Sequence, residues 1–248
     1  MKDTPNVAAD RATQTAISDV KRRAPSLRRF ETIHLDQRGD IVETTRLAPS
    51  TPLFESAFSA FARGAILRTD MGPRAVEDLL PGDRIETANG LTELRWKGTM
   101  LIVPNAGNDT PLVRIGADAL GMMRPQMDVV LGPSARILHR ASGVKQLTGQ
   151  DKALTLATEF SDGVTITEMR PIAPVQVFHI AFDRHEILNV GGIELESYHP
   201  GPEHLVSIRG NMLDLFLSMF PHIKELSDFG PLSRPRVSLR DLDLFSAA

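Results

Sequence analysis

Three side chains close together near position 180 have the chemistry to act in one site: His179, Asp183 and His185. Alternate residues of a strand point to the same face, so His179 and Asp183 would face one side of a strand that contains both. Imidazole and carboxylate groups bind metals and move protons near neutral pH. The three residues therefore define a candidate metal site, although it lacks a fourth ligand. The structural alternative is a turn in which Asp183 caps backbone amides and His185 is partly buried.

The absence of cysteine limits the chemistry of the chain more than any residue that is present. None of the 248 residues is a cysteine, which excludes disulfides, thiolate metal sites and thiol catalysis together. The other histidines near the C-terminus are scattered, and we interpret each of them as a surface residue: His199, His204 and His222.

The composition is that of an ordinary globular protein, with 42% hydrophobic residues, 24% charged residues and a net charge of -3. This is enough for one sizeable core or two small ones. A slightly acidic chain gives no reason to expect nucleic-acid binding. No apolar run approaches the roughly 20 residues that span a bilayer, and the N-terminus lacks the apolar segment of a secretory signal. We expect a cytoplasmic protein with no membrane span and no cofactor.

Short apolar segments separated by Gly and Pro predict a mainly β domain over residues 56–200. The Asn89-Gly90 pair is a strong hairpin signal within it. Two short helices are expected to interrupt the strands, at 117–122 and 151–159. The expected strands are 64–69, 84–87, 91–97, 112–115, 127–131, 135–138, 164–167, 175–182 and 186–190.

The N-terminal part predicts two further segments. Residues 1–30 are polar and basic at their end, which predicts a flexible basic tail with one short helix near 12–20. Residues 31–55 predict a short hairpin or linker, because β-branched residues flank a turn at Arg38-Gly39-Asp40.

The C-terminal part, residues 201–248, predicts a helical and then extended segment. Large apolar residues recur at helical spacing between 205 and 220. We expect this helix to pack its apolar face on the β domain and to end or kink at Pro221.

Four segments carry a resemblance to a known family. The most specific reads Val-Glu-Asp-Leu-Leu-Pro-Gly-Asp and lies at the end of the second segment. It predicts a turn in which Gly82 has positive φ and Asp83 bonds to local amides. The segments are Ala60 to Ala65, Gly72 to Asp83, Val129 to Ala135, and Phe178 to Leu188 followed by Glu194 to Tyr198.

Together these segments resemble a Hint domain, the self-processing module shared by hedgehog proteins and inteins, in the form found in alphaproteobacterial proteins. The resemblance implies an all-β Hint fold. It also implies an N-to-S acyl shift, in which a cysteine attacks the preceding carbonyl and a Thr-x-x-His or Ser-x-x-His element supplies the proton. Those three positions are Ala60, Gly132 and Ala135 here. The resemblance therefore predicts a degenerate domain whose chemistry is absent, with Asp183 and His185 as remnants of its site. Changing all three positions back to Cys, Thr and His is expected to show whether the scaffold still supports cleavage.

Three alternative chemistries would rely on other residues of the chain. Ser59 precedes Ala60 and is an alternative nucleophile through an N-to-O shift, although a hydroxyl ionises much less readily than a thiol. His139 would lie about 13 Å from Ala135 along a strand, and we interpret it as a surface residue. No Asn in the chain is followed by Ser, Thr or Cys, so the intein route that starts from alanine lacks its junction.

The sequence therefore predicts a catalytically inactive Hint-like protein that acts as a binding or scaffold module. Two alternatives stay open. One is residual self-cleavage through Ser59, and the other is a small-ligand or metal-binding module in the former cleft. A protein partner is possible, and the sequence does not identify it.

Overall fold

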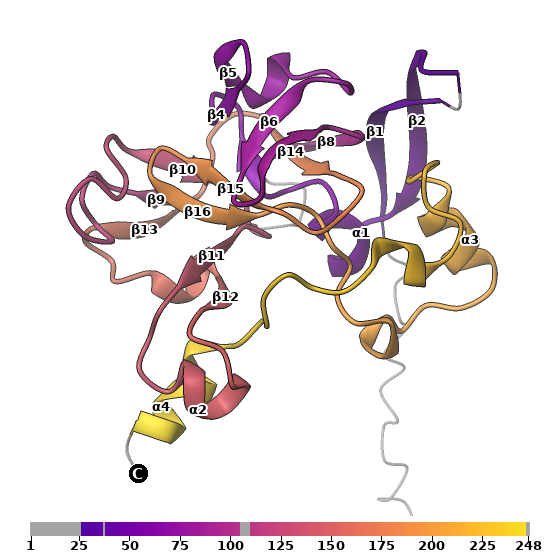
Figure 1. Cartoon of the computed structure of the whole chain (residues 1–248). Helices are drawn as coiled ribbons and strands as arrows, with labels where there is room; N and C mark the ends of the chain where they lie inside the picture. The colour runs from indigo at the N-terminus through magenta and orange to yellow at the C-terminus, as the bar shows by residue number, and fades with distance from the viewer. Residues whose placement is uncertain (1–25, 37, 105–109, 247–248) are drawn as a thin grey trace, which may run out of the picture.

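The structure is a computed structural model that describes residues 26–36, 38–104 and 110–246, with no side-chain description for 243–246. The predicted helix near 12–20 and most of the predicted basic tail lie outside these residues. The described part is mainly β, as the sequence predicts, with sixteen strands in two sheets. Figure 1 shows the β1–β2 hairpin at one end of the molecule and α2 (Val144–Thr148) with α4 (Leu239–Ser246) at the other.

The first sheet joins the N-terminal hairpin to the strands that surround position 60. Its neighbouring strands are antiparallel. In sheet order they are β13 (Ile166–Met169), β9 (Leu112–Ile115), β10 (Val129–Leu131), β3 (Phe61–Ala62), β14 (Val175–Ala181), β8 (Trp96–Ile102), β1 (Leu27–Leu35) and β2 (Ile41–Pro49).

The second sheet carries the remaining strands. Its neighbouring strands are also antiparallel, and β5 (Gly72–Ala75) pairs with β4 at one side. The two sheets meet over one apolar core that includes Phe61, Leu131 and Leu195. In sheet order the strands are β12 (Ala153–Leu156), β11 (Arg136–His139), β16 (Ile193–Glu196), β15 (Ile187–Val190), β4 (Ile66–Thr69), β6 (Arg84–Thr87) and β7 (Gly90–Glu93).

The Val-Glu-Asp-Leu-Leu-Pro-Gly-Asp motif forms a 3₁₀ turn, η1 (Val76–Asp78), and a tight turn after it. Gly82 has a φ of +98°, and the Asp83 carboxylate accepts hydrogen bonds from the Leu80 amide and from Arg74, each at 2.8 Å. Both predictions for this motif are confirmed. The buried ammonium of Lys97 donates to the carbonyls of Glu77 and Leu79 at 2.7 and 2.5 Å. The motif is therefore a structural element that is fixed to β8 through the hydrogen bonds of Lys97.

A second core of aromatic side chains lies outside the first, between the hairpin, α1 (Pro52–Ser56) and the C-terminal segment. Trp96 is fully buried, and its indole N–H donates to the Met219 carbonyl at 2.7 Å. Its ring packs against Phe58 and Phe220 with centroids 5.5 and 4.7 Å apart. This core fastens the flanking segments to the β domain, since each of them contributes large rings that would otherwise be exposed.

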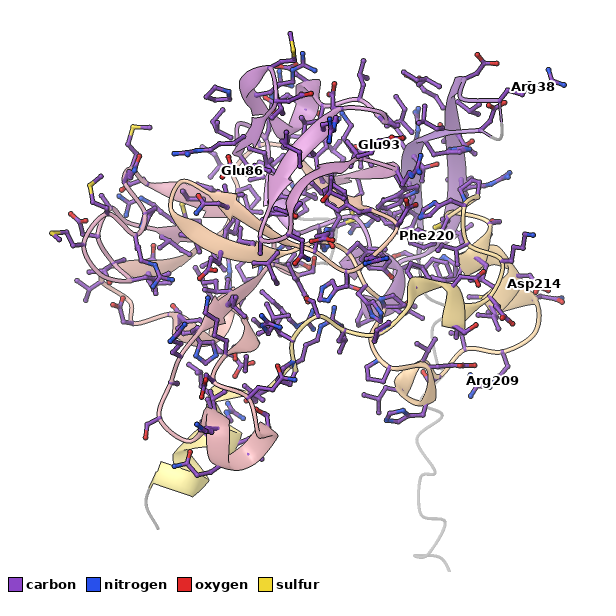
Figure 2. The ribbon with its side chains drawn as sticks, in the orientation of Figure 1. Arg38, Glu86, Glu93, Arg209, Asp214 and Phe220 are labelled. Carbon is purple, nitrogen blue, oxygen red and sulfur yellow. The ribbon has the colours of Figure 1, made fainter. Side chains whose placement is uncertain are left out.

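The predicted C-terminal helix docks as expected but is shorter than its apolar stripe. The regular helix α3 covers only Asn211–Leu217, with 3₁₀ turns η3 (Glu203–Leu205) before it and η4 (Leu226–Phe229) after it. Phe216 and Phe220 are fully buried. Figure 2 shows Phe220, which follows the end of α3, in the interior, whereas Asp214 of α3 points outward. Leu205 is 69% exposed and is not part of the docked face.

Three expectations about local structure are wrong. The predicted helix 151–159 is strand β12 followed by the 3₁₀ turn η2 (Ala157–Phe160). Leu154 there pairs with Leu138 on one side and with the C-terminal segment on the other, so sheet contacts override helix propensity. Residues 117–122 form turns. The hairpin begins at Leu27, four residues earlier than predicted, because Leu27 to Arg29 continue the ladder with β2.

Candidate functional site

The three positions of the predicted site come together at the junction of β3 and β10. The Ala60 amide donates to the Phe178 carbonyl at 2.9 Å, and the Gly132 amide donates to the Ala60 carbonyl at 2.8 Å. Ala135 closes the turn by donating to the Gly132 carbonyl at 3.2 Å. Ala60 and Ala135 are each 1% exposed and belong to the apolar core. The backbone is unbroken at this junction, and none of these three residues has a side chain able to act as a nucleophile or an acid.

Gly132 is in contact with the peptide that a self-processing protein would cleave. A Cβ atom built on Gly132 would lie 2.0 Å from the Ser59 carbonyl oxygen and 2.6 Å from its carbon. Carbon atoms do not approach that closely, so any side chain here would require the Ser59–Ala60 peptide to move. The expectation that the triple restoration would test the scaffold is therefore wrong, because Gly132→Thr would collide with the bond under test.

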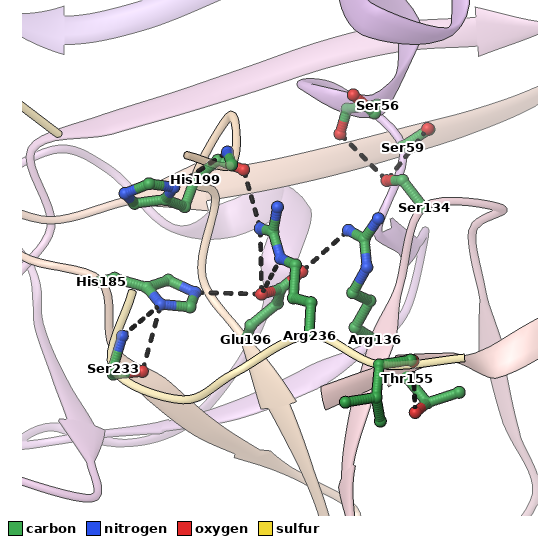
Figure 3. Close-up of polar contacts among 12 residues, drawn as sticks. Ser56, Ser59, Ser134, Arg136, Thr155, His185, Glu196, His199, Ser233 and Arg236 are labelled. Atoms are coloured by element: carbon green, nitrogen blue, oxygen red, sulfur yellow. Dashed lines mark hydrogen bonds and ion pairs between the residues drawn. The ribbon is translucent and has the colours of Figure 1, made fainter. Parts of the chain in front are cut away.

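Ser59 is buried and hydrogen-bonded within its own turn (Figure 3). Its Oγ donates to the Glu55 carbonyl at 2.8 Å and lies 3.2 Å from the Ser134 Oγ. The Ser134 hydroxyl in turn donates to the Ser56 carbonyl at 3.0 Å. A carbonyl and a hydroxyl are not bases at neutral pH, so none of these contacts would activate Ser59 as a nucleophile.

His179 lies in the core beside this junction. Its ring is 2% exposed and packs edge-on against Phe61 and Tyr198, with centroids 5.7 and 5.3 Å away. Its Nδ1 accepts the Ile180 amide at 3.1 Å. Burial lowers the pKa of His179 to about 3. At neutral pH the imidazole is therefore uncharged and enclosed by rings.

Asp183 lies at the surface and does not join His179. Strand β14 ends at Ala181, so the alternation that would place both residues on one face does not continue to Asp183. Its carboxylate accepts two hydrogen bonds from Arg95, at 2.9 and 3.1 Å. His185 lies in a third environment. Within the described residues no group of three His, Asp or Glu side chains has a geometry able to hold a metal ion.

His185 belongs to a buried cluster of charged groups around Glu196 (Figure 3). The Glu196 side chain is 2% exposed. Arg136 donates to one carboxylate oxygen at 3.0 Å, and the Nε of Arg236 donates to the other at 3.1 Å. The Nε2 of His185 is 3.1 Å from the same second oxygen. Strands β11 and β16 and the C-terminal segment are thereby tied together at one carboxylate.

The charge of Glu196 is stabilised although the group is enclosed. Burial by itself would raise its pKa, but contact with His185 and the two guanidinium groups outweighs burial and lowers the pKa to about 2. Arg236 also donates to the His199 carbonyl at 2.8 Å. His199 has the Gly201 amide on Nδ1 and the Gly230 carbonyl on Nε2, each at 2.9 Å. Burial lowers the pKa of His199 to about 4, so it is neutral at pH 7.

Ser233, His185 and Glu196 form a line that has the composition of a hydrolase triad. The Ser233 Oγ lies 3.1 Å from the Nδ1 of His185, and Glu196 contacts the other ring nitrogen. However, the Ser233 backbone amide donates to that same Nδ1 at 3.0 Å. The lone pair that would accept the serine proton is thus occupied, and a general base needs it free. The arrangement supports a structural contact rather than acyl transfer.

Sequence reasoning did not identify most of this cluster. Glu196 stands in the fourth resembling segment, but alternation along β16 places it on the face of the partly exposed Glu194, so its burial has no signal in the sequence. Ser233 and Arg236 come from the C-terminal segment, about 40 residues further on, and no local pattern places them there. His199 is 6% exposed and is not the surface residue that was expected. His139 is also not the surface residue that was expected. It is half-buried, and its Nε2 is 2.8 Å from the Thr155 Oγ.

The fold is that of a mainly β domain built from two sheets around one core. The Hint domain family model matches residues 59–202, more than half of the chain, and the chain belongs to the Hint domain family. Among solved structures the chain is similar to a GSH-linked, splice-inactive variant of the AceL NrdHF class 3 split intein. That match has 12% identity and a TM-score of 0.39, and it covers 56% of this chain and 97% of the intein. That TM-score is too low for this match to establish a common fold. No curated protein matches the chain.

In the residues that the structure describes, no helix has the length and apolar character for a bilayer crossing.

Proposed function

We propose that this protein is a Hint-fold binding or scaffold module that does not process itself. The observation that supports this best is the contact of Gly132 with the Ser59 carbonyl, 2.0 Å from where a Cβ would stand. In a working site a hydroxyl at this position polarises the scissile amide. Here the scissile peptide occupies the space of that hydroxyl. Ala60 and Ala135 supply no nucleophile and no proton donor.

Residual cleavage through Ser59 is the weaker alternative. An N-to-O shift needs the Ser59 Oγ to attack the Phe58 carbonyl while a base removes its proton. The contacts of that oxygen are a carbonyl and a second hydroxyl. The nearby imidazole of His179 has its pKa lowered by burial and its Nδ1 on a backbone amide. This supports an inert Ser59.

Trapping experiments test the proposal. Incubation with dithiothreitol or hydroxylamine cleaves any thioester or ester that forms in the chain. We expect the unmodified protein and the Ala60→Cys variant to remain intact, since members of a catalytic unit restored singly recover little activity. Fragments from the unmodified protein, with a break next to Ser59 or Ala60, would contradict the proposal.

One observation favours a ligand-binding role near the former cleft. A cavity of about 480 Å³ is lined by Asp183 and Arg95 from the domain and by His34 and His222 from the flanking segments. Three buried ring nitrogens there have no hydrogen-bond partner among the residues that the structure describes: Nδ1 of His34 and both nitrogens of His222. Unpaired buried polar atoms are rare and indicate an unseen water or ligand. Because Asp183 is already bound by Arg95, the lining favours a small polar molecule over a metal.

NMR of the two imidazole rings tests this second function. Acetate, glycine and glycerol would each be added to the labelled protein while the ring signals of His34 and His222 are followed. Saturable shifts confined to these two rings, and lost in His222→Phe, would support a ligand site. Unchanged signals with all three molecules would remove this candidate.

A further inference from the structure

A second cavity, of about 270 Å³, is lined by residues other than Ala60, Gly132 and Ala135 of the junction. Segments distant in sequence contribute to it. Arg124 comes from the loop before β10, Arg140 follows β11, Lys152 precedes β12, and Glu194 lies on β16. Phe160, from η2, forms part of its wall.

The charges of this cavity do not balance. Lys152 is neutralised by Glu194, with its Nζ 3.1 and 3.3 Å from the two carboxylate oxygens. Arg124 and Arg140 have neither a hydrogen bond nor an ion pair from their side chains within the described part of the chain. Two uncompensated guanidinium groups therefore line one small hollow of a protein whose net charge is -3. Such groups match the geometry of carboxylate and phosphate oxygens.

The cavity also has an apolar floor and an aromatic wall. Ile137 and Leu138 beneath it are 1% and 2% exposed. The ring of Phe160 meets His139 edge-on, with centroids 5.2 Å apart. These surfaces exclude water from one side of a bound molecule, which strengthens the attraction of an anion to the guanidinium groups. A flat apolar group could lie against them.

The proton of His139 is fixed by its neighbour. The Thr155 hydroxyl donates its hydrogen to the Val237 carbonyl at 2.8 Å, so it must accept from the Nε2–H of His139. Burial lowers the pKa of this imidazole. At neutral pH the ring is therefore an uncharged wall of the cavity, and its positive charge comes from the arginines.

We propose that this cavity binds a small organic anion, with a carboxylate or phosphate held by Arg124 and Arg140 and a flat apolar group placed against Phe160. The site does not depend on whether the chain processes itself. All of its lining residues lie within the Hint domain at 59–202, and none of them is among the residues at the junction of β3 and β10.

Calorimetric titration with benzoate, benzamide and inorganic phosphate tests the proposal on the full chain. Benzoate has the anion and the ring, benzamide has only the ring, and phosphate has only the anion. We expect benzoate to bind most tightly and benzamide to give no heat. The variants Arg124→Gln and Arg140→Gln should each weaken benzoate binding at least tenfold, whereas the control Arg68→Gln, an exposed arginine on β4, should leave it unchanged.

Melting curves of the variants show that each one remains folded. Absence of benzoate binding at millimolar concentration, or equal binding by Arg140→Gln, would overturn the proposal. Phosphate binding as tight as benzoate binding would overturn the role given to Phe160. Benzamide binding as tight as benzoate binding would overturn the role given to the two arginines.

Discussion

The junction at Ala60 and the charge cluster at Glu196 lie in one domain and have opposite chemistry. At the junction the family's reactive positions are a methyl group, a hydrogen and a methyl group, held together by backbone hydrogen bonds. At the cluster a carboxylate, two guanidiniums and an imidazole are enclosed together. Residues of the resembling segments are thus present where they hold the structure together. The proposed function rests on the absence of reactive side chains at the junction, where the residues are Ala60, Gly132 and Ala135.

The cluster also differs in where its residues come from. The junction is built entirely within the matched segment 59–202, whereas Ser233 and Arg236 lie outside it. The segment between α3 and α4 crosses to β12, where the Leu154 amide donates to the Pro235 carbonyl at 2.8 Å (Figure 1). The C-terminal part is therefore a component of the folded domain. Four predictions test this comparison, from the largest expected effect to the smallest.

Neutralising Glu196 should destabilise the protein most. Glu196→Gln leaves Arg136 and Arg236 enclosed without a counter-charge, and breaking a buried ion pair on one side costs roughly 3–5 kcal/mol. Glu194→Gln is the matched control, because its pair with Lys152 is partly exposed and such pairs contribute about 1 kcal/mol or less. Urea unfolding of both variants gives the comparison. Equal losses would mean that the cluster is no more important than a surface pair.

Lowering the pH should reduce the free energy of unfolding, because protonation of the buried imidazoles favours the unfolded chain. The folded pKa values of His179 and His199 are about 3 and about 4, below the ordinary value of 6.5. The unfolded chain therefore binds protons that the folded chain excludes, so stability is present above pH 6.5 and is lost as the pH falls toward 4. At pH 5 each imidazole should cost about 2 kcal/mol.

Unfolding free energies measured between pH 7 and 5 check this prediction. His199→Gln should make the pH dependence shallower by about one proton, whereas replacing the exposed His204 should not change it. A pH-independent free energy over this range would contradict the burial of the two rings.

Gly132 should not tolerate even a methyl group. Gly132→Ala places a Cβ against the Ser59 carbonyl, and overpacking of this kind costs about 1–3 kcal/mol. Gly116→Ala is the control, since its Cβ would come only within 3.1 Å of the Thr165 carbonyl oxygen. Thermal unfolding should give a clearly lower melting temperature for Gly132→Ala than for Gly116→Ala. The reverse order would show that the junction has room for a side chain.

Replacing Asp183 should have the smallest effect on the free energy of unfolding. It resembles a remnant of the family's site as much as His185 does, but its side chain is 66% exposed and its pair with Arg95 lies at the surface. Asp183→Asn should change the free energy of unfolding by at most about 1 kcal/mol. Denaturant titration of Asp183→Asn and His185→Asn compares the free energy of unfolding that each variant loses. A larger loss for Asp183→Asn than for His185→Asn would contradict this prediction.

Local signals in the sequence predicted local structure well. The hairpin at Asn89-Gly90 and the positive φ of Gly82 follow from short motifs. The contact of Ala60 with Gly132 was implied by the family resemblance rather than by a local pattern. Features that depend on distant segments were not predictable. Residues 151–159 look helical alone and become a strand because β11 and residues 235–237 pair with both edges.

The same dependence on distant segments explains why the candidate site was predicted only in part. His179 and Asp183 share a strand face only if the strand includes both, and it ends at Ala181. The partners of His185 could not be read from its neighbours, since Glu196 and Ser233 are set by how β16 and the C-terminal segment dock. The two arginines of the 270 Å³ cavity likewise come from separate loops.

The central claim is that the chain crosses the former catalytic junction unbroken and chemically inert. Intact-mass measurement of the purified protein, beside Ser59→Ala, tests it most directly. The account predicts one species with the mass of all 248 residues in both samples, unchanged after days of incubation. A second species that begins at residue 59 or 60 in the unmodified protein, and disappears in Ser59→Ala, would show that Ser59 is a working nucleophile and would contradict the account.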